Sequence, residues 1–150
     1  MTLKLWEKNG WIRSHQTSPQ EVAGLLSIVD RDLTDSQGRI SPDWQFGIAY
    51  NAALKLCTIL LHASGYRPEK NLQHFRTLAA LPLILGDKRK ADAAYLDACR
   101  IKRNTVEYDM AGAATEQDAK ELLAFSKQLR DEVLAWLKNE HPNLIPDTKT

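Results

Sequence analysis

The sequence is poor in the residues that build metal centres, disulfide frameworks and redox sites. Its 150 residues include two cysteines, Cys57 and Cys99, and contain neither a Cys-x-x-Cys pair nor a His-Glu-x-x-His motif. Both cysteines lie in apolar stretches with helical spacing, which is typical of reduced thiols in the core of a cytosolic protein. We therefore expect no metal site and no cofactor.

An excess of charge of either sign is also missing, since 20 basic residues stand against 19 acidic ones and the formal net charge is +1. This balance gives no overall attraction to nucleic acid, so any basic binding surface has to be local. The N-terminal stretch lacks the apolar segment of a secretory signal, and no apolar run approaches the length that spans a membrane. We expect a cytoplasmic protein without a membrane partner.

What the chain does contain is an ordinary globular composition, with 43% hydrophobic and 26% charged residues. A chain of this length and composition can bury a core without cross-links. No stretch alternates apolar and polar residues as a half-buried strand does, whereas helical spacing recurs throughout. The sequence therefore predicts an all-α protein, an up-and-down bundle of four to five helices over residues 18–140. Residues 1–17 are expected to form an N-terminal arm and residues 141–150 a flexible tail.

Local signals place the helices. A serine cap at Ser18, Pro19 at the first helical position and Glu21 three residues after the cap form a capping-box pattern, which predicts a helix start. The helix predicted for residues 42–64 is apolar around most of its circumference and should lie at the centre of the bundle. It is expected to pack against an antiparallel neighbour of similar length, residues 88–111. Further helices are predicted for residues 71–81, up to a break at Pro82, and from Thr115 onward.

Polar residues inside these patterns require partners. Tyr50 and Asn51 interrupt the central helix, and we expect one of them to hydrogen-bond toward the neighbouring long helix. His62, near the end of the central helix, is expected to be a solvated or capped helix residue rather than a ligand. Asp30 and Asp32 lie near the C-terminal end of the first helix, where the helix dipole disfavours them. These two aspartates are candidates to face an arginine elsewhere, or simply water.

The 88–111 helix carries the most unusual stretch of the chain. Arg103 falls on one helical line with apolar residues, namely Leu96, Cys99, Val106 and Met110. An arginine in an apolar seam is costly unless a carboxylate, an amide or a ligand meets it. Glu107 lies one turn later and can pair with it. The adjoining face carries further polar residues, Arg100, Asn104 and Tyr108. This cluster is a phosphate or nucleotide site, a subunit interface, or a buried structural ion pair with a solvated flank.

These residues, taken with their surroundings, resemble the HEPN domain superfamily, the higher eukaryote and prokaryote nucleotide-binding domain. The resemblance covers roughly residues 18–137. It rests on Arg103-Asn104 followed by Tyr108-Asp109, on the runs 48–54 and 63–66, and on His74-Phe75-Arg76-Thr77 before Ala80-Leu81-Pro82. It implies a helical bundle that forms a homodimer with the arginine motif facing the cleft between subunits. It also implies, as for some HEPN proteins, a nucleotidyltransferase partner in a toxin–antitoxin pair.

Many HEPN domains are metal-independent ribonucleases whose motif joins an arginine, often followed by a polar residue, to a histidine four to six residues later. Arg103 and Asn104 match this motif, but Tyr108 occupies the histidine position. Tyrosine, with a pKa near 10, is a poor general base at neutral pH. The leading hypothesis is therefore a HEPN-like domain that binds a nucleotide, RNA or a protein partner without the standard ribonuclease chemistry.

Two alternatives stay open. In the first, the domain is a metal-independent endoribonuclease in which Arg103 stabilises the transition state and Tyr108 or His74 moves protons. In the second, the bundle acts only by surface contacts, and Arg103 is neutralised internally. The candidate partners for that neutralisation are Glu107, Asp30 and Asp32.

Overall fold

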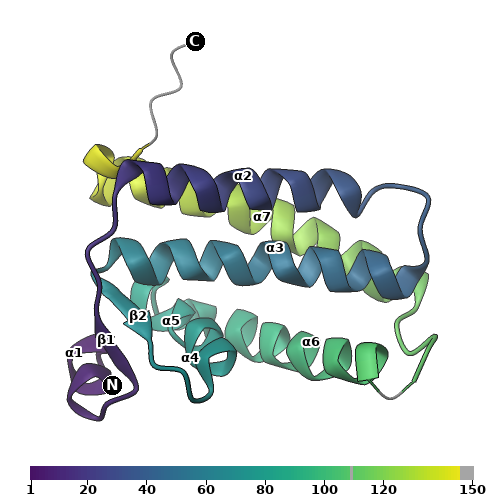
Figure 1. Ribbon diagram of the computed structural model, residues 1–150, viewed down its shortest axis with the longest axis horizontal. Helices are drawn as coiled ribbons and strands as arrows, with labels where there is room; N and C mark the ends of the chain where they lie inside the picture. Colours follow the sequence, from purple (N-terminus) through teal and green to yellow (C-terminus); the bar gives the residue numbers. More distant parts are fainter. Residues whose placement is uncertain (109, 146–150) are drawn as a thin grey trace.

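Four long helices dominate the fold (Figure 1). The computed structural model describes residues 1–108 and 110–145. The long helices are α2 (Pro19–Asp35), α3 (Pro42–Ala63), α6 (Lys90–Tyr108) and α7 (Glu116–Glu140). Helix α3 runs opposite to α2 and α6 and in the same direction as α7. The predicted all-α class and the up-and-down course of the chain are therefore confirmed.

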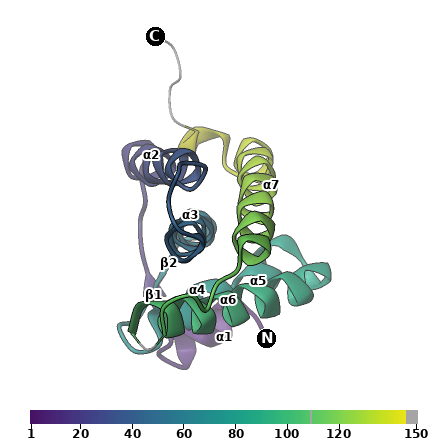
Figure 2. The same ribbon diagram turned by 90° about the vertical axis from the view of Figure 1, so that its right-hand side faces the viewer.

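Helix α3 is the centre of the bundle, as its apolar circumference predicts. It contacts α2, α7 and α6, and Figure 2 shows it enclosed by them. The predicted contact between α3 and α6 is present, but α3 packs more extensively on α2 and α7, because α6 crosses it obliquely. Fully buried side chains such as Leu56, Ile59 and Leu60 each stabilise the fold by about 1.5–3 kcal/mol through burial.

The apolar character of α3 also bears on membranes. By length and composition alone α3 could cross a bilayer, which corrects the expectation that no apolar run approaches that length. However, 67% of its most apolar window is buried inside the bundle. Packing against the other helices therefore accounts for its composition.

Side-chain caps confirm three of the predicted helix starts, those of α2, α3 and α7. The hydroxyl oxygen of Ser18 accepts from the Glu21 N–H at 3.1 Å, and that of Ser41 accepts from the Trp44 N–H at 3.3 Å. At α7 the capping box is complete, with Thr115 and Asp118 bonded in both directions. At α2 it is only half formed, because the Glu21 carboxylate turns away from the cap toward His15, Thr17 and His62.

The boundaries of α6 differ from the prediction at both ends. A 3₁₀ turn, η1 (Asp87–Arg89), precedes it, and the helix ends at Tyr108 rather than at residue 111. The Met110 N–H donates to the Thr105 carbonyl at 2.8 Å, and this bond over five residues closes the helix. Gly112 follows in the left-handed region, with φ of 81°, as expected of a glycine beyond a helix end. Residue Asp109 lies outside the described residues.

The helix predicted for residues 71–81 is shorter in the structure, and a second short helix follows it. These two pieces are α4 (Gln73–Ala79) and α5 (Leu81–Leu85). Pro82 lies in the first turn of α5, where its missing N–H has no helical partner to lose. The proline therefore begins the second piece instead of simply ending the first.

The N-terminal arm contains structure that the sequence pattern did not indicate. Helix α1 (Leu3–Lys8) leads to strand β1 (Ile12–Ser14), which pairs antiparallel with β2 (Tyr66–Pro68). The expectation of no β-structure is wrong for these residues. Strands of three residues are too short to show an alternating pattern, so only the tertiary contact defines them. Trp6 and Ile12 form a second small core with Leu61 and Ala80.

The C-terminal segment is also more ordered than predicted. Residues 142–144 form a 3₁₀ turn, η2 (Pro142–Leu144), which contacts α2 and α7. Leu144 is buried in the main core. The predicted flexible tail is therefore wrong for residues 141–145, because an apolar anchor holds them, while residues 146–150 lie outside the described residues.

Candidate functional site

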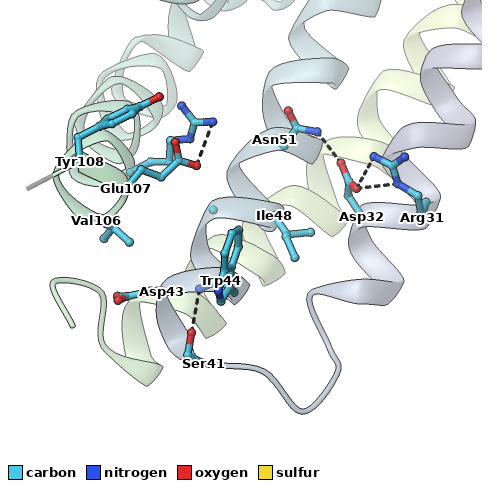
Figure 3. Close-up of a pocket in the computed structure, with 12 residues that line it drawn as sticks. Arg31, Asp32, Ser41, Asp43, Trp44, Ile48, Asn51, Val106, Glu107 and Tyr108 are labelled. Atoms are coloured by element: carbon cyan, nitrogen blue, oxygen red, sulfur yellow. Dashed lines mark hydrogen bonds and ion pairs between the residues drawn. The ribbon is translucent and has the colours of Figure 1, made fainter. Parts of the chain in front are cut away.

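A groove of about 660 Å³ opens where α3 begins and α6 ends (Figure 3). Helix α3 forms its floor, α6 one wall and α2 the other. The residues that matter most below are Trp44 and Asn51 of α3, Arg103 and Tyr108 of α6, and Asp32 of α2. The groove thus brings together part of the predicted cluster with residues from two other helices.

Arg103 is held loosely in this groove. Its Nη2 lies 3.2 Å from Glu107 Oε1, which confirms the predicted pair one helical turn apart. Its Nη1 has only a marginal 3.5 Å contact with Asn104 Oδ1. Its Nε is buried and has no hydrogen-bond partner among the described residues. Because the guanidinium carries five N–H donors, most of its donor capacity is left unused.

Asn51 does not bond toward α6, contrary to the prediction. Its Nδ2 donates to Asp32 Oδ2 at 2.6 Å, on the opposite wall. Asp32 is buried and also accepts from Arg31, from Nε at 3.1 Å and from Nη2 at 3.0 Å. The Asp32 carboxylate is a charged acceptor within hydrogen-bond distance of the amide, and such bonds are stronger than neutral ones.

Tyr50 lies against α6 but does not hydrogen-bond to it. Its side chain is 1% exposed, and its hydroxyl has no partner among the described residues. The Arg103 guanidinium lies 5.9 Å from the centre of its ring. Burial raises the pKa of Tyr50, so the phenol stays protonated. Tyr50 therefore supports Arg103 through its ring rather than through its hydroxyl.

The other acidic residues near the groove are occupied. Asp30 pairs with Arg130 of α7, with Nε and Oδ1 2.6 Å apart, which confirms that it faces a distant arginine. The Asp43 carboxylate accepts from the backbone N–H of Gly112 at 2.6 Å and of Ala114 at 3.1 Å. These bonds tie the connection between α6 and α7 to the start of α3. Of the three carboxylates considered for Arg103, only Glu107 reaches it.

Two aromatic side chains that line the groove together with Arg103 are open to solvent. Tyr108 is 76% exposed on α6, and Trp44 is 64% exposed on α3. Figure 3 shows the Trp44 ring rising between the α6 side, with Tyr108, and the α2 side, with Asp32. Sequence reasoning named Tyr108 but missed Trp44. The available signal was a tryptophan in the first turn of a helix, next to its serine cap, where the helix emerges from the core.

Besides Tyr50, three of the predicted site residues do not line the groove. Arg100 pairs with Asp97 at 2.8 Å and lies 5.8 Å from the centre of the Phe75 ring. Asn104 reaches only the Arg103 side chain. His74 is exposed on α4. The pKa of His74 is nevertheless affected by a residue of the groove. It is lowered first by partial burial and then by the positive charges of Arg103, Lys55 and Arg100.

The remaining sequence predictions concern cysteines and histidines. Cys57 and Cys99 are free and buried, as predicted, and burial raises the pKa of Cys57 to about 12 and of Cys99 to about 11. These thiols are therefore poor nucleophiles. His62 is not solvated as expected, since its Nδ1 lies 2.8 Å from Glu21 Oε1 and its side chain is largely buried.

No protein-family model, no curated protein and no solved structure matches the chain. The HEPN resemblance therefore stays a prediction, and the function has to rest on the geometry of the groove.

Proposed function

We propose that the groove binds a phosphate-bearing aromatic ligand, a nucleotide or single-stranded RNA, without cleaving it. The observation that carries this proposal is that Arg103, whose buried Nε has no partner among the described residues, lines the same groove as the exposed rings of Trp44 and Tyr108. A planar guanidinium suits phosphate oxygens. Aromatic faces stack on bases, which contributes about 1–3 kcal/mol per base. The same groove therefore offers a group for each half of a nucleotide.

The pair between Arg103 and Glu107 is compatible with phosphate binding. It is a single contact of 3.2 Å on a partly exposed helix face. Such pairs stabilise proteins by only about 0.3–0.5 kcal/mol, so a phosphate can displace the carboxylate. The carboxylates of Asp32 and Asp43 are held in place, since each already accepts two or more hydrogen bonds. Arg31 balances the charge of Asp32, whereas the donors to Asp43 are neutral backbone N–H groups.

The second candidate function is ribonuclease activity, and one observation favours it. The lowered pKa of His74 keeps its imidazole neutral near Arg103, and a neutral imidazole can accept a proton. Against this, His74 is not among the residues that line the groove. Tyr108, which does line it, carries a phenol, and a phenol is a poor general base at neutral pH. Binding without cleavage is therefore the better supported function.

The test is binding of a fluorescently labelled single-stranded oligoribonucleotide, followed by anisotropy. Arg103→Ala should weaken binding about 10–100-fold, because hydrogen bonds to charged groups contribute about 1.5–3 kcal/mol. Arg100→Ala is the matched control, since it removes the same charge one turn away but outside the groove. Its effect should stay below about threefold at moderate salt. Equal losses in both variants, or no binding by the wild type, would overturn the proposal.

We also propose that the protein forms a homodimer through this end of the bundle. Trp44, Tyr108 and Met110 are large exposed side chains from the two segments that meet there. The HEPN resemblance leads to the same expectation, with the arginine in a cleft between subunits. Light scattering coupled to size exclusion tests it at micromolar concentration. A species of 17.0 kDa at every concentration would rule the dimer out.

A further inference from the structure

A cluster of two histidines and a glutamate lies at the other end of α3 from the groove. His15 follows β1, Glu21 lies in the first turn of α2, and His62 lies in the last turn of α3. The distances to Glu21 Oε1 are 2.6 Å from His15 Nε2 and 2.8 Å from His62 Nδ1. The two imidazole rings are 4.4 Å apart between centroids. All three side chains are partly buried.

The three ligand atoms converge on one point. They lie within 4.8 Å of one another, and among the described residues this is the only group of three such side chains so placed. The Thr17 hydroxyl also donates to Glu21 Oε1, at 2.7 Å. One carboxylate oxygen is thus approached by three side chains, although it has two lone pairs. This crowding goes beyond what a simple helix cap requires.

Two imidazoles and a carboxylate are a zinc-binding donor set. The same composition, with water as the fourth ligand, occurs in catalytic zinc sites. For tetrahedral zinc the bond lengths of about 2.0–2.2 Å place neighbouring ligand atoms roughly 3.4 Å apart. The distances of 2.6 Å and 2.8 Å to Glu21 Oε1 would have to widen by about 0.6–0.8 Å. His15 can supply that movement, because it lies in the connection between β1 and α2 rather than inside a helix.

We propose that His15, Glu21 and His62 bind one zinc ion, with solvent at the fourth position. Imidazole nitrogen selects for zinc and related transition metals, whereas magnesium and calcium prefer all-oxygen ligands. The bound ion would join three segments, namely the N-terminal arm, the start of α2 and the end of α3. The alternative is a hydrogen-bonded triad in which each neutral imidazole donates its N–H to Glu21. Both arrangements hold the arm in place, but only one takes up metal.

The experiment is a calorimetric titration of chelator-treated protein with zinc chloride. The wild type should bind one equivalent with micromolar or tighter affinity. Its melting temperature should rise by about 5–10 °C at a hundredfold excess of zinc over the dissociation constant. Magnesium chloride should do neither. Cobalt(II) should give visible absorption of the intensity typical of a four-coordinate site.

The chain provides its own controls, because it has four histidines. His15→Gln and His62→Gln should each weaken zinc binding at least about tenfold, since a ligand is lost. His74→Gln and His141→Gln should leave it unchanged, because neither residue belongs to the cluster. His15→Gln alters a connecting segment and serves if His62→Gln does not fold. The absence of stoichiometric zinc binding by folded wild type, or equal losses in the control variants, would overturn the proposal.

Discussion

Asp32 and Arg103 line opposite walls of one groove, and the structure treats their charges in different ways. The side chain of Asp32 is 6% exposed and accepts hydrogen bonds from both Asn51 and Arg31. The side chain of Arg103 is 28% exposed, has one carboxylate contact, and has a buried Nε without a partner among the described residues. The protein itself therefore supplies the hydrogen-bond donors that Asp32 needs. Arg103 is held in position, but some of its N–H donors have no acceptor among the described residues.

This difference separates two roles that a charged residue in a helical bundle can have. A buried carboxylate with matched donors fastens helices together, and its removal leaves those donors unpaired. A partly exposed arginine beside open aromatic rings adds little to stability and keeps its donors for a ligand. If this distinction holds, substitutions on the α2 side should change stability. Substitutions on the α6 side should change binding.

The largest effect is expected from Tyr108→His, on the cleavage of single-stranded RNA. The wild type should not cleave single-stranded RNA above background, because no histidine is among the described residues that line the groove. Tyr108→His places an imidazole five residues after Arg103, as in the HEPN ribonuclease motif. General acid–base catalysis contributes about 10²–10⁴-fold, so cleavage should become measurable. The measurement is the product yield from a labelled oligoribonucleotide in the presence of a chelator.

The control for this prediction is Tyr108→Phe, which removes the hydroxyl and keeps the ring. It should bind RNA nearly as well as the wild type and remain inactive. Cleavage by the wild type that Tyr108→Phe abolishes would contradict the assignment of Tyr108 as a stacking and positioning group. Ribonuclease activity would then be the better hypothesis.

The second prediction compares the two walls by stability. Asp32→Ala should lower the free energy of unfolding by about 2 kcal/mol, because it leaves Asn51 and Arg31 without their charged acceptor. Arg103→Ala should lower it by less than about 1 kcal/mol. Urea denaturation measures both. Asp30→Ala is the matched control, since it removes a carboxylate of the same helix whose pair with Arg130 lies at the surface. A loss in Arg103→Ala as large as in Asp32→Ala would remove the proposed distinction.

The smallest expected effect is on the pKa of His74. Partial burial lowers it first, and the positive charge of Arg103 contributes next. A cation near an imidazole disfavours its protonated form, so Arg103→Ala should raise the pKa toward 6.5. It should not reach that value, because burial, Lys55 and Arg100 remain. Proton NMR of the histidine rings measures the shift, and His141 serves as the internal reference. An unchanged His74 would show that Arg103 does not act on it.

Features set by neighbouring residues were predictable from the sequence. The starts of α2, α3 and α7 follow from Ser18, Ser41 and Thr115, because a cap acts within one turn. The pair between Arg103 and Glu107 is likewise local. The central position of α3 follows from its own composition. In each of these cases the deciding contact lies within a few residues or within a single element.

Features set by distant contacts were not predictable. The Glu21 carboxylate does not complete the predicted capping box and instead hydrogen-bonds with His62, which lies 41 residues away in the sequence. Asn51 bonds to Asp32 instead of α6, since the relative placement of three helices decides which partner is nearer. The exposure of Trp44 depends on where α2 and α6 leave α3 uncovered. The residue pattern within one helix does not determine which distant residue becomes a hydrogen-bond partner or which side chain stays exposed.

The indole N–H signals of the four tryptophans test the central claim most directly. Of these residues only Trp44 lines the groove, whereas Trp6 and Trp11 lie in the N-terminal arm and Trp136 on α7. In a ¹H–¹⁵N titration with single-stranded RNA, the Trp44 signal should shift in the wild type and stay fixed in Arg103→Ala, with the other three unchanged. If RNA binds while the Trp44 signal stays fixed, the groove is not the binding site.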